Sequence, residues 1–153
     1  MEVGDFKGIT HILVGISFFM AVENYFFLAI DGFIILTCIV IGSLLPDIDH
    51  PSSKLGRYAY PLSAVVQHRG FTHSFISSLI LPLPAILIST RYYYALVVGY
   101  LLHLLADTLN PSGVMWLYPY KKKYSLKLAN TGGLEEVIFS VIAIMFIFSS
   151  VFK

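Results

Sequence analysis

Residues 92–109, YYYALVVGYLLHLLADTL, form an unbroken apolar run that nevertheless contains a histidine and an aspartate. About 17 to 25 apolar residues cross a bilayer as an α-helix, so this run predicts a transmembrane helix. A helix is favoured over a strand because it satisfies its backbone hydrogen bonds within one segment. His103 and Asp107 are four residues apart and therefore share one face of that helix. Since leucines surround the pair, this face is expected to point into a helical bundle.

Four further apolar runs accompany this one, at 8–22, 32–46, 72–88 and 135–151. Together the five predict an all-α, polytopic transmembrane bundle of about five helices, forming a single domain over residues 1–153. The composition agrees, since only 12% of the residues are charged, against about 25% in soluble domains. Pro82 and Pro84 interrupt the third run and are expected to kink or shorten its helix. The boundary between the first two runs stays open, because Glu23 and Asp31 flank a further apolar stretch.

Basic residues are distributed unevenly between the two ends of these helices. With five crossings, eight lysines and arginines lie on the same side as the N-terminus, and only Arg91 and Lys153 lie on the other. Short basic loops stay in the cytoplasm, so we expect an integral membrane protein with a cytoplasmic N-terminus and an external C-terminus. The first residues do not resemble a cleaved signal peptide. A net charge of +1 gives no reason to expect a nucleic acid partner, and membrane lipid is expected instead.

All five histidines fall at helix ends on the predicted cytoplasmic side, together with three aspartates. The residues are His11, Asp47, Asp49, His50, His68, His73, His103 and Asp107. Ionisable groups at the membrane boundary are costly and usually mark function. Imidazole and carboxylate ligands suit zinc, manganese or iron, whereas Cys38, the single cysteine, cannot build a thiolate site alone. One or two divalent ions are expected, with zinc or manganese first, and an open position on an ion would activate water for phosphoester hydrolysis.

Structural roles are the alternative for each of these residues. His103 and Asp107 can be a buried hydrogen-bonded pair that braces its helix, and Asp47 and Asp49 can mark a helix end beside a turn. Arg69 can clamp a phosphate or serve as a solvated positive-inside residue. Independent placement would scatter such groups over both faces of the membrane, so a shared site is favoured.

Three motifs occur together along the chain. They are Leu45-Pro46-Asp47-Ile48-Asp49-His50-Pro51, His68-Arg69-Gly70-Phe71-Thr72-His73-Ser74 and Gly99-x-x-x-His103-Leu104-x-x-Asp107. With them the chain resembles, over roughly residues 8–135, a family of membrane-bound, metal-dependent hydrolases that is also described as LexA-binding and inner-membrane-associated. The resemblance implies a small helical membrane protein with metal-dependent hydrolase activity. The metal ligands that it implies are His11, Asp47, Asp49, His73, His103 and Asp107, with His68 and Arg69 beside them.

The favoured hypothesis is therefore a cytoplasm-facing, metal-dependent hydrolase of a phosphoester or lipid-like substrate. In this hypothesis His68 shuttles a proton and Arg69 neutralises developing charge, so both are candidate catalytic residues. A proton- or metal-coupled transporter is one alternative, but it would place such groups near the membrane midplane, often in repeated halves. A membrane-anchored interaction module is another, in which a structural metal has a closed coordination sphere.

Overall fold

The structure, a computed structural model, describes residues 8–26, 29–49, 70–130 and 132–151. Within these ranges it contains five α-helices, three short 3-10 helices and no β-strand. In chain order they are α1 (Gly8–Phe26), α2 (Ala29–Gly42), η1 (Pro46–Asp49), η2 (Phe71–His73), α4 (Phe75–Ile80), η3 (Leu83–Leu87), α5 (Thr90–Thr108) and α6 (Leu134–Val151). The predicted all-α fold is confirmed for the described part of the chain.

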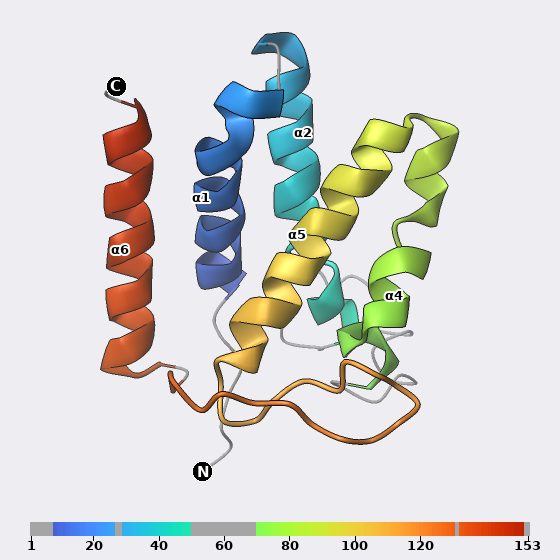
Figure 1. Ribbon diagram of the computed structural model, residues 1–153, viewed down its shortest axis with the longest axis vertical. Helices are drawn as coiled ribbons and strands as arrows, with labels where there is room; N and C mark the ends of the chain where they lie inside the picture. Colours follow the sequence, from blue (N-terminus) through green and yellow to red (C-terminus); the bar gives the residue numbers. More distant parts are fainter. Residues whose placement is uncertain (1–7, 27–28, 50–69, 131, 152–153) are drawn as a thin grey trace.

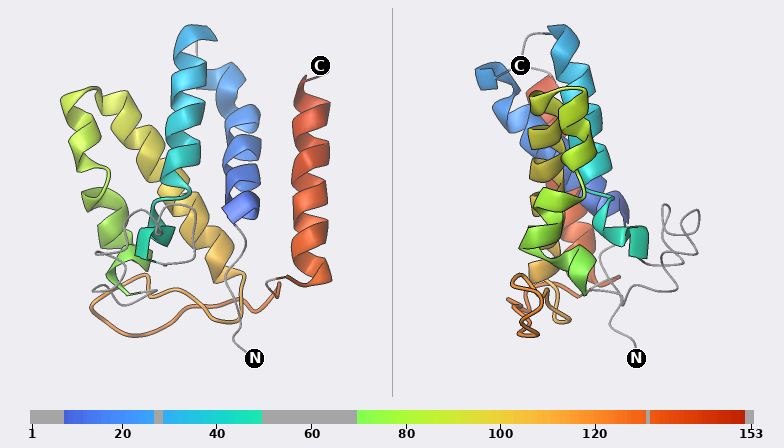
Figure 2. Two further views of the ribbon diagram at one scale, coloured as in Figure 1. Left: turned by 180° about the vertical axis from the view of Figure 1, so that it is seen from behind. Right: turned by 90° about the vertical axis from the view of Figure 1, so that its right-hand side faces the viewer.

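The long helices alternate in direction, so that α1 and α6 begin at the end of the molecule where α2 and α5 finish (Figure 1). We call this the cluster end. η1, η2 and the start of α4 lie there as well, and the segment between α5 and α6 runs beneath them. α1 packs between α2 and α6, as the view from behind shows (Figure 2). Chain segments that are far apart in sequence therefore meet at one end of the bundle.

Two described segments, Asp31–Asp49 and Leu134–Val151, are long and apolar enough to cross a membrane. Gly8–Val22 and Phe75–Leu87 are apolar but shorter, and α5 carries tyrosines, a histidine and an aspartate within its apolar sequence. Along α6 the apolar side chains are widely exposed, and Met145 reaches 67%. A helix that is apolar on its outer face is typical of contact with lipid.

The third apolar run does not form one continuous helix. α4 ends at Ile80, and η3 follows after Pro82. Proline has no N–H to donate and its ring clashes with the preceding turn, so the α-helical hydrogen bonding stops there. The predicted interruption at Pro82 and Pro84 thus takes the form of a change from α-helix to 3-10 helix.

The second run also ends earlier than its apolar sequence suggests. α2 finishes at Gly42, and Pro46–Asp49 turns as η1. η1 packs against both η2 and α5. The turn therefore takes Asp47 and Asp49 off the axis of α2 and brings them to the other segments at the cluster end.

α2 and α5 cross with almost no space between their backbones. A Cβ atom added at Gly99 would lie 2.0 Å from the carbonyl oxygen of Ile39, and one added at Gly42 would lie 2.2 Å from that of Leu96. Glycine at both positions lets the helices approach closely, as small residues do in membrane helix pairs. The crossing is surrounded by a buried apolar core of Phe19, Ile35, Ile39 and Ala95.

Gly99→Ala is expected to destabilise the bundle, because the added methyl group would overlap the backbone of α2. Overpacking of this kind costs about 1–3 kcal/mol, which equilibrium unfolding of the detergent-solubilised protein measures. Gly8→Ala is the matched control, since a Cβ at Gly8 makes an ordinary contact with Leu44 at 3.6 Å. Equal unfolding free energies for the two variants would contradict the close crossing.

Candidate metal centre

Side chains from α1, η1, η2 and α5 converge at the cluster end. They are His11 from α1, Asp47 and Asp49 from η1, His73 from η2, and His103 and Asp107 from α5. We call these six residues the ligand cluster. Asp47 is its most exposed member, with 13% of the side chain accessible, and the other five are buried. His50, His68 and Arg69 lie outside the described residues.

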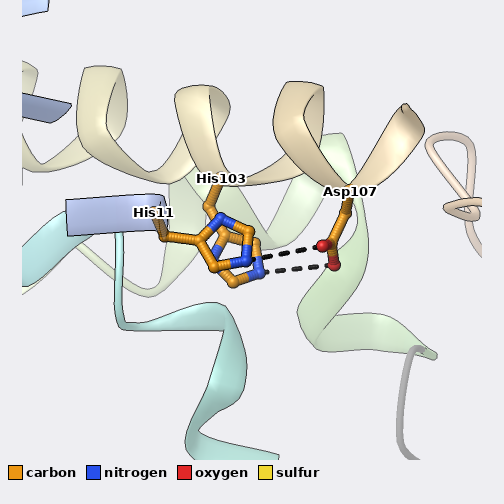
Figure 3. Close-up of side chains that lie close together, drawn as sticks. All are labelled: His11, His103 and Asp107. Carbon is orange, nitrogen blue, oxygen red and sulfur yellow. Dashed lines mark ion pairs between the residues drawn. The ribbon is translucent and has the colours of Figure 1, made fainter. Parts of the chain in front are cut away.

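Asp107 lies at the middle of the ligand cluster. Its Oδ1 is 3.5 Å from Nε2 of His11, and its Oδ2 is 3.5 Å from Nε2 of His73 and 3.5 Å from Nε2 of His103. Nε2 of His103 is also 3.7 Å from Oδ1 of Asp47. The rings of His11 and His103 stack with centroids 3.8 Å apart, and each presents a nitrogen to the Asp107 carboxylate (Figure 3).

These nitrogen–oxygen distances fit a shared metal ion better than they fit hydrogen bonds. A charge-assisted N–H···O bond is about 2.7–2.9 Å long. Two ligands of a tetrahedral ion, each about 2.0–2.2 Å from it, are about 3.3–3.6 Å apart. The four distances around Asp107 and His103 are 3.5, 3.5, 3.5 and 3.7 Å. Consistently, Nε2 of His103 is buried and makes no hydrogen bond with any residue that the structure describes.

The electrostatics of the ligand cluster also favour a cation. Asp47, Asp49 and Asp107 bring three carboxylates into a largely dry space, and burying a charge without compensation costs several kcal/mol. Two groups of ligand atoms, from His11, His103 and Asp107 and from Asp47, His73 and His103, each lie within 4.8 Å of one another. The residues therefore fit a divalent ion.

Two histidines are oriented by contacts on the ring nitrogen that points away from Asp107. Nδ1 of His103 is 2.8 Å from the carbonyl oxygen of Ser43 and donates to it, which leaves the lone pair of Nε2 facing the carboxylates. Nδ1 of His73 contacts Oγ1 of Thr72 at 3.2 Å and lies 3.6 Å from Oδ2 of Asp49. The Thr72 hydroxyl donates to that same Asp49 oxygen. Such outer contacts are typical of metal-bound histidines.

Asp49 therefore differs from the other carboxylates of the ligand cluster. Its Oδ2 lies on the Nδ1 side of His73, whereas Nε2 of that ring faces Asp107. We propose that Asp49 orients His73 through this contact with Nδ1. The sequence interpretation grouped it with the ligands, and it missed Thr72, whose only signal is its position beside His73 in the second motif.

Asp49→Asn is consequently expected to weaken metal binding without abolishing it. Loss of an outer-sphere partner typically costs about 10–100-fold in metal affinity, and zinc titration of the metal-free protein measures this. Asp47→Asn is the comparison, because Asp47 faces Nε2 of His103 directly. Its substitution should lower the affinity for zinc more than Asp49→Asn does. An equal loss of affinity in both variants would make Asp49 a ligand.

Buried hydrogen bonds hold the segments of the ligand cluster together. The Tyr100 hydroxyl, one turn before His103, donates to the carbonyl oxygen of Thr72 and lies 3.1 Å from Oγ of Ser77. This ties α5 to η2 and thus His103 to His73. On the other side of α1, Oγ1 of Thr10 donates to Oε1 of Glu136 at 2.6 Å. The sequence gave no sign of this link between α6 and α1.

Comparison with known proteins gives a family and several relatives. The model of a family described as YdjM inner membrane protein matches residues 6–152. The inner membrane protein YdjM of Escherichia coli (strain K12) is 39% identical over 105 residues, which cover 61% of this chain and 51% of that protein. The uncharacterized protein YvsG of Bacillus subtilis (strain 168) is 33% identical over 140 residues, 84% of each chain.

A third relative, the inner membrane protein YbcI of Escherichia coli (strain K12), is 38% identical over 91 residues, 53% of this chain and 51% of that protein. The chain thus covers about half the length of each of two of these relatives, YdjM and YbcI. No solved structure matches it.

Proposed function

The chain belongs to the YdjM inner membrane protein family, and we propose that it binds one or two divalent metal ions and hydrolyses a phosphoester or lipid-like substrate with them. The observation that supports this most directly is the spacing of Nε2 and carboxylate oxygen atoms around Asp107 and His103, 3.5–3.7 Å. The relatives are named for the inner membrane or as uncharacterized. The metal and the hydrolysis therefore rest on the residues of the ligand cluster.

We propose a polytopic arrangement in which the cluster end faces the cytoplasm. Lys121, Lys122, Lys123 and Lys127 are exposed in the segment between α5 and α6, which runs beneath the cluster end (Figure 1). Basic loops stay cytoplasmic, and each lysine near anionic headgroups contributes about 1 kcal/mol. With five crossings, this orientation leaves the N-terminus in the cytoplasm and the C-terminus outside.

The metal ligands in this proposal are His11, Asp47, His73, His103 and Asp107. Imidazole with carboxylate suits zinc or manganese, and tetrahedral spacing of the donor atoms favours zinc. One oxygen of Asp107 faces His11 and the other faces His73 and His103. If two ions bind, Asp107 would therefore bridge them.

A divalent ion bound in such a site acidifies water and polarises a phosphoryl oxygen. The proton of the attacking water passes to His68, the proposed proton shuttle, and Asp47 remains a metal ligand. The water oxygen then forms a bond to phosphorus, the bond to the leaving oxygen breaks, and that oxygen takes up a proton. His68 is proposed as the proton donor and Arg69 as the group that neutralises the phosphoryl charge. Both directly precede Gly70 in sequence and lie outside the described residues.

A second candidate function is a membrane-anchored interaction module in which the metal only braces the bundle. The complete burial of His11, His73, His103 and Asp107 favours it, because structural metal sites are closed and catalytic ones keep an open position. Cobalt(II)-substituted protein distinguishes the two. Inorganic phosphate should change its visible absorption spectrum if a position is open, and an unchanged spectrum would favour the structural role.

Hydrolysis is tested with protein that is purified in detergent, stripped by a chelator and reloaded with zinc or manganese. We expect phosphodiesterase activity on bis(p-nitrophenyl) phosphate and on phospholipid in mixed micelles only after reloading. The same preparation of Asp107→Asn should be inactive. Stoichiometric metal without hydrolysis of either substrate would reject the hydrolase and leave the structural role.

A further inference from the structure

A groove of about 280 Å³ lies between α1, α5 and α6. On α1 it is lined by Thr10, Val14 and Ser17, which are spaced by four and three residues and so lie on one face of the helix. On α6 the lining includes Ile142 and Phe146. Its walls are almost entirely apolar, and nothing in the hydrolytic mechanism above uses them.

One end of the groove lies beside the ligand cluster. Thr10 and Ala106 line it, and each directly precedes a cluster residue, His11 and Asp107, in its helix. From Thr10 the groove extends along α1 to Ser17, which corresponds to about 10 Å at 1.5 Å per residue. It therefore runs parallel to the helices, from the cluster end towards the middle of the bundle.

On α6 the groove is bordered by side chains that are partly exposed at the surface of the bundle. Phe139, Ile142 and Phe146 line it and are 41%, 57% and 41% exposed. Two hydrogen bonds hold α6 against α1. Thr10 donates to Glu136 at 2.6 Å, and Ser17 donates to the carbonyl oxygen of Ala143 at 3.4 Å. The two helices are thus joined while apolar space remains between their side chains.

We propose that this groove binds one acyl chain of a membrane phospholipid whose phosphoester is the substrate of the ligand cluster. An empty apolar space forfeits dispersion contacts, and water would find few polar partners in it. In an inner-membrane protein the apolar material next to α6 is the lipid acyl chain. The proposal rests on the proposed hydrolase function and adds the substrate class to it.

The orientation of a bilayer lipid agrees with the position of the groove. A phospholipid in the leaflet at the cluster end has its phosphate near the helix ends and its chains along the helices. A chain lying from Thr10 to Ser17 therefore brings the phosphoester to the level of His11 and Asp107. A soluble phosphoester would reach the ligand cluster without using the groove. Blocking the groove should therefore affect turnover of the lipid and not turnover of a soluble phosphoester.

The first arm of the test is photo-crosslinking. The detergent-solubilised protein is incubated with phosphatidylglycerol that carries a diazirine in one acyl chain, irradiated, and mapped by peptide mass spectrometry. We expect crosslinks on α1 from Thr10 to Ser17 and on the facing residues of α6. Ile142→Trp should lose them by filling the groove. Val141→Trp, an adjacent and similarly exposed position outside the groove lining, should keep them.

The second arm compares turnover of long-chain phosphatidylglycerol with that of bis(p-nitrophenyl) phosphate in metal-loaded protein. Ile142→Trp is expected to lower turnover of the lipid at least tenfold and to leave turnover of the soluble diester and metal content unchanged. If Ile142→Trp leaves lipid turnover and crosslinking unaltered, the groove does not bind the acyl chain, and the proposed hydrolase function is unaffected. Absence of turnover for both substrates in wild-type protein would instead reject the hydrolase, and the substrate assignment with it.

Discussion

Asp107→Asn is expected to retain less than about a tenth of the wild-type metal content, because loss of even an outer-sphere partner costs about 10–100-fold in affinity. The substitution keeps the size of the side chain and removes the negative charge that lies within 3.5 Å of three imidazole nitrogens. Metal per chain is measured by inductively coupled plasma mass spectrometry after parallel purifications. Zinc should also stabilise wild-type protein, by about 2.7 kcal/mol at 100 times its Kd, and should not stabilise the variant.

Asp31→Asn is the matched control for this prediction. Asp31 is a carboxylate on α2 whose side chain is 46% exposed and pairs with Arg91 at 3.1 Å. It lies near the start of α2, whereas the ligand cluster lies beyond the end of that helix. The control should therefore keep wild-type metal content and zinc-dependent stability. Equal metal in the two variants would mean that Asp107 is not a ligand.

His103→Asn is expected to have the second-largest effect, loss of most of the bound metal with the fold retained. The asparagine amide can donate to the Ser43 carbonyl oxygen as Nδ1 of His103 does, but it has no atom at the position of Nε2. His103 belongs to both groups of ligand atoms, so an ion in either group would lose this ligand. Metal content and circular dichroism measure the two parts of the prediction.

His103→Gln separates ligand loss from misplacement of the helix. The glutamine carbonyl can approach the position of Nε2, while the donor to Ser43 is lost. We expect partial metal retention, above that of His103→Asn and below wild type. Stoichiometric metal in His103→Asn would contradict the assignment of Nε2 as a ligand atom.

The sequence predicted the helices well where an apolar run is long and free of proline. The expected run at 135–151 is α6, and that at 92–109 is α5, each displaced by one or two residues. The end of the helix in the second run was harder to predict, because the apolar residues continue past Gly42 although the helix does not. η1, which follows α2, contacts η2 and α5, and these tertiary contacts have no counterpart in the apolar pattern.

The gathering of histidines and aspartates at one end of the helices could be anticipated from their positions in the apolar sequence, and the resemblance implied the six members of the ligand cluster. The relative placement of these residues could not be anticipated. Whether Asp49 faces Nδ1 or Nε2 of His73 depends on the relative placement of η1 and η2. Likewise, Gly42 and Gly99 are ordinary glycines in sequence, and only the crossing of α2 and α5 shows that each faces a backbone carbonyl.

The most direct test of the central claim is X-ray absorption at the zinc edge, recorded with metal quantification on zinc-loaded wild-type protein. The ligand cluster predicts one or two zinc ions per chain, nitrogen and oxygen ligands at about 2.0–2.2 Å, and outer-shell scattering from at least two imidazoles. Less than a tenth of an equivalent of zinc, or a spectrum without imidazole scattering, would show that these histidines and aspartates do not hold a metal.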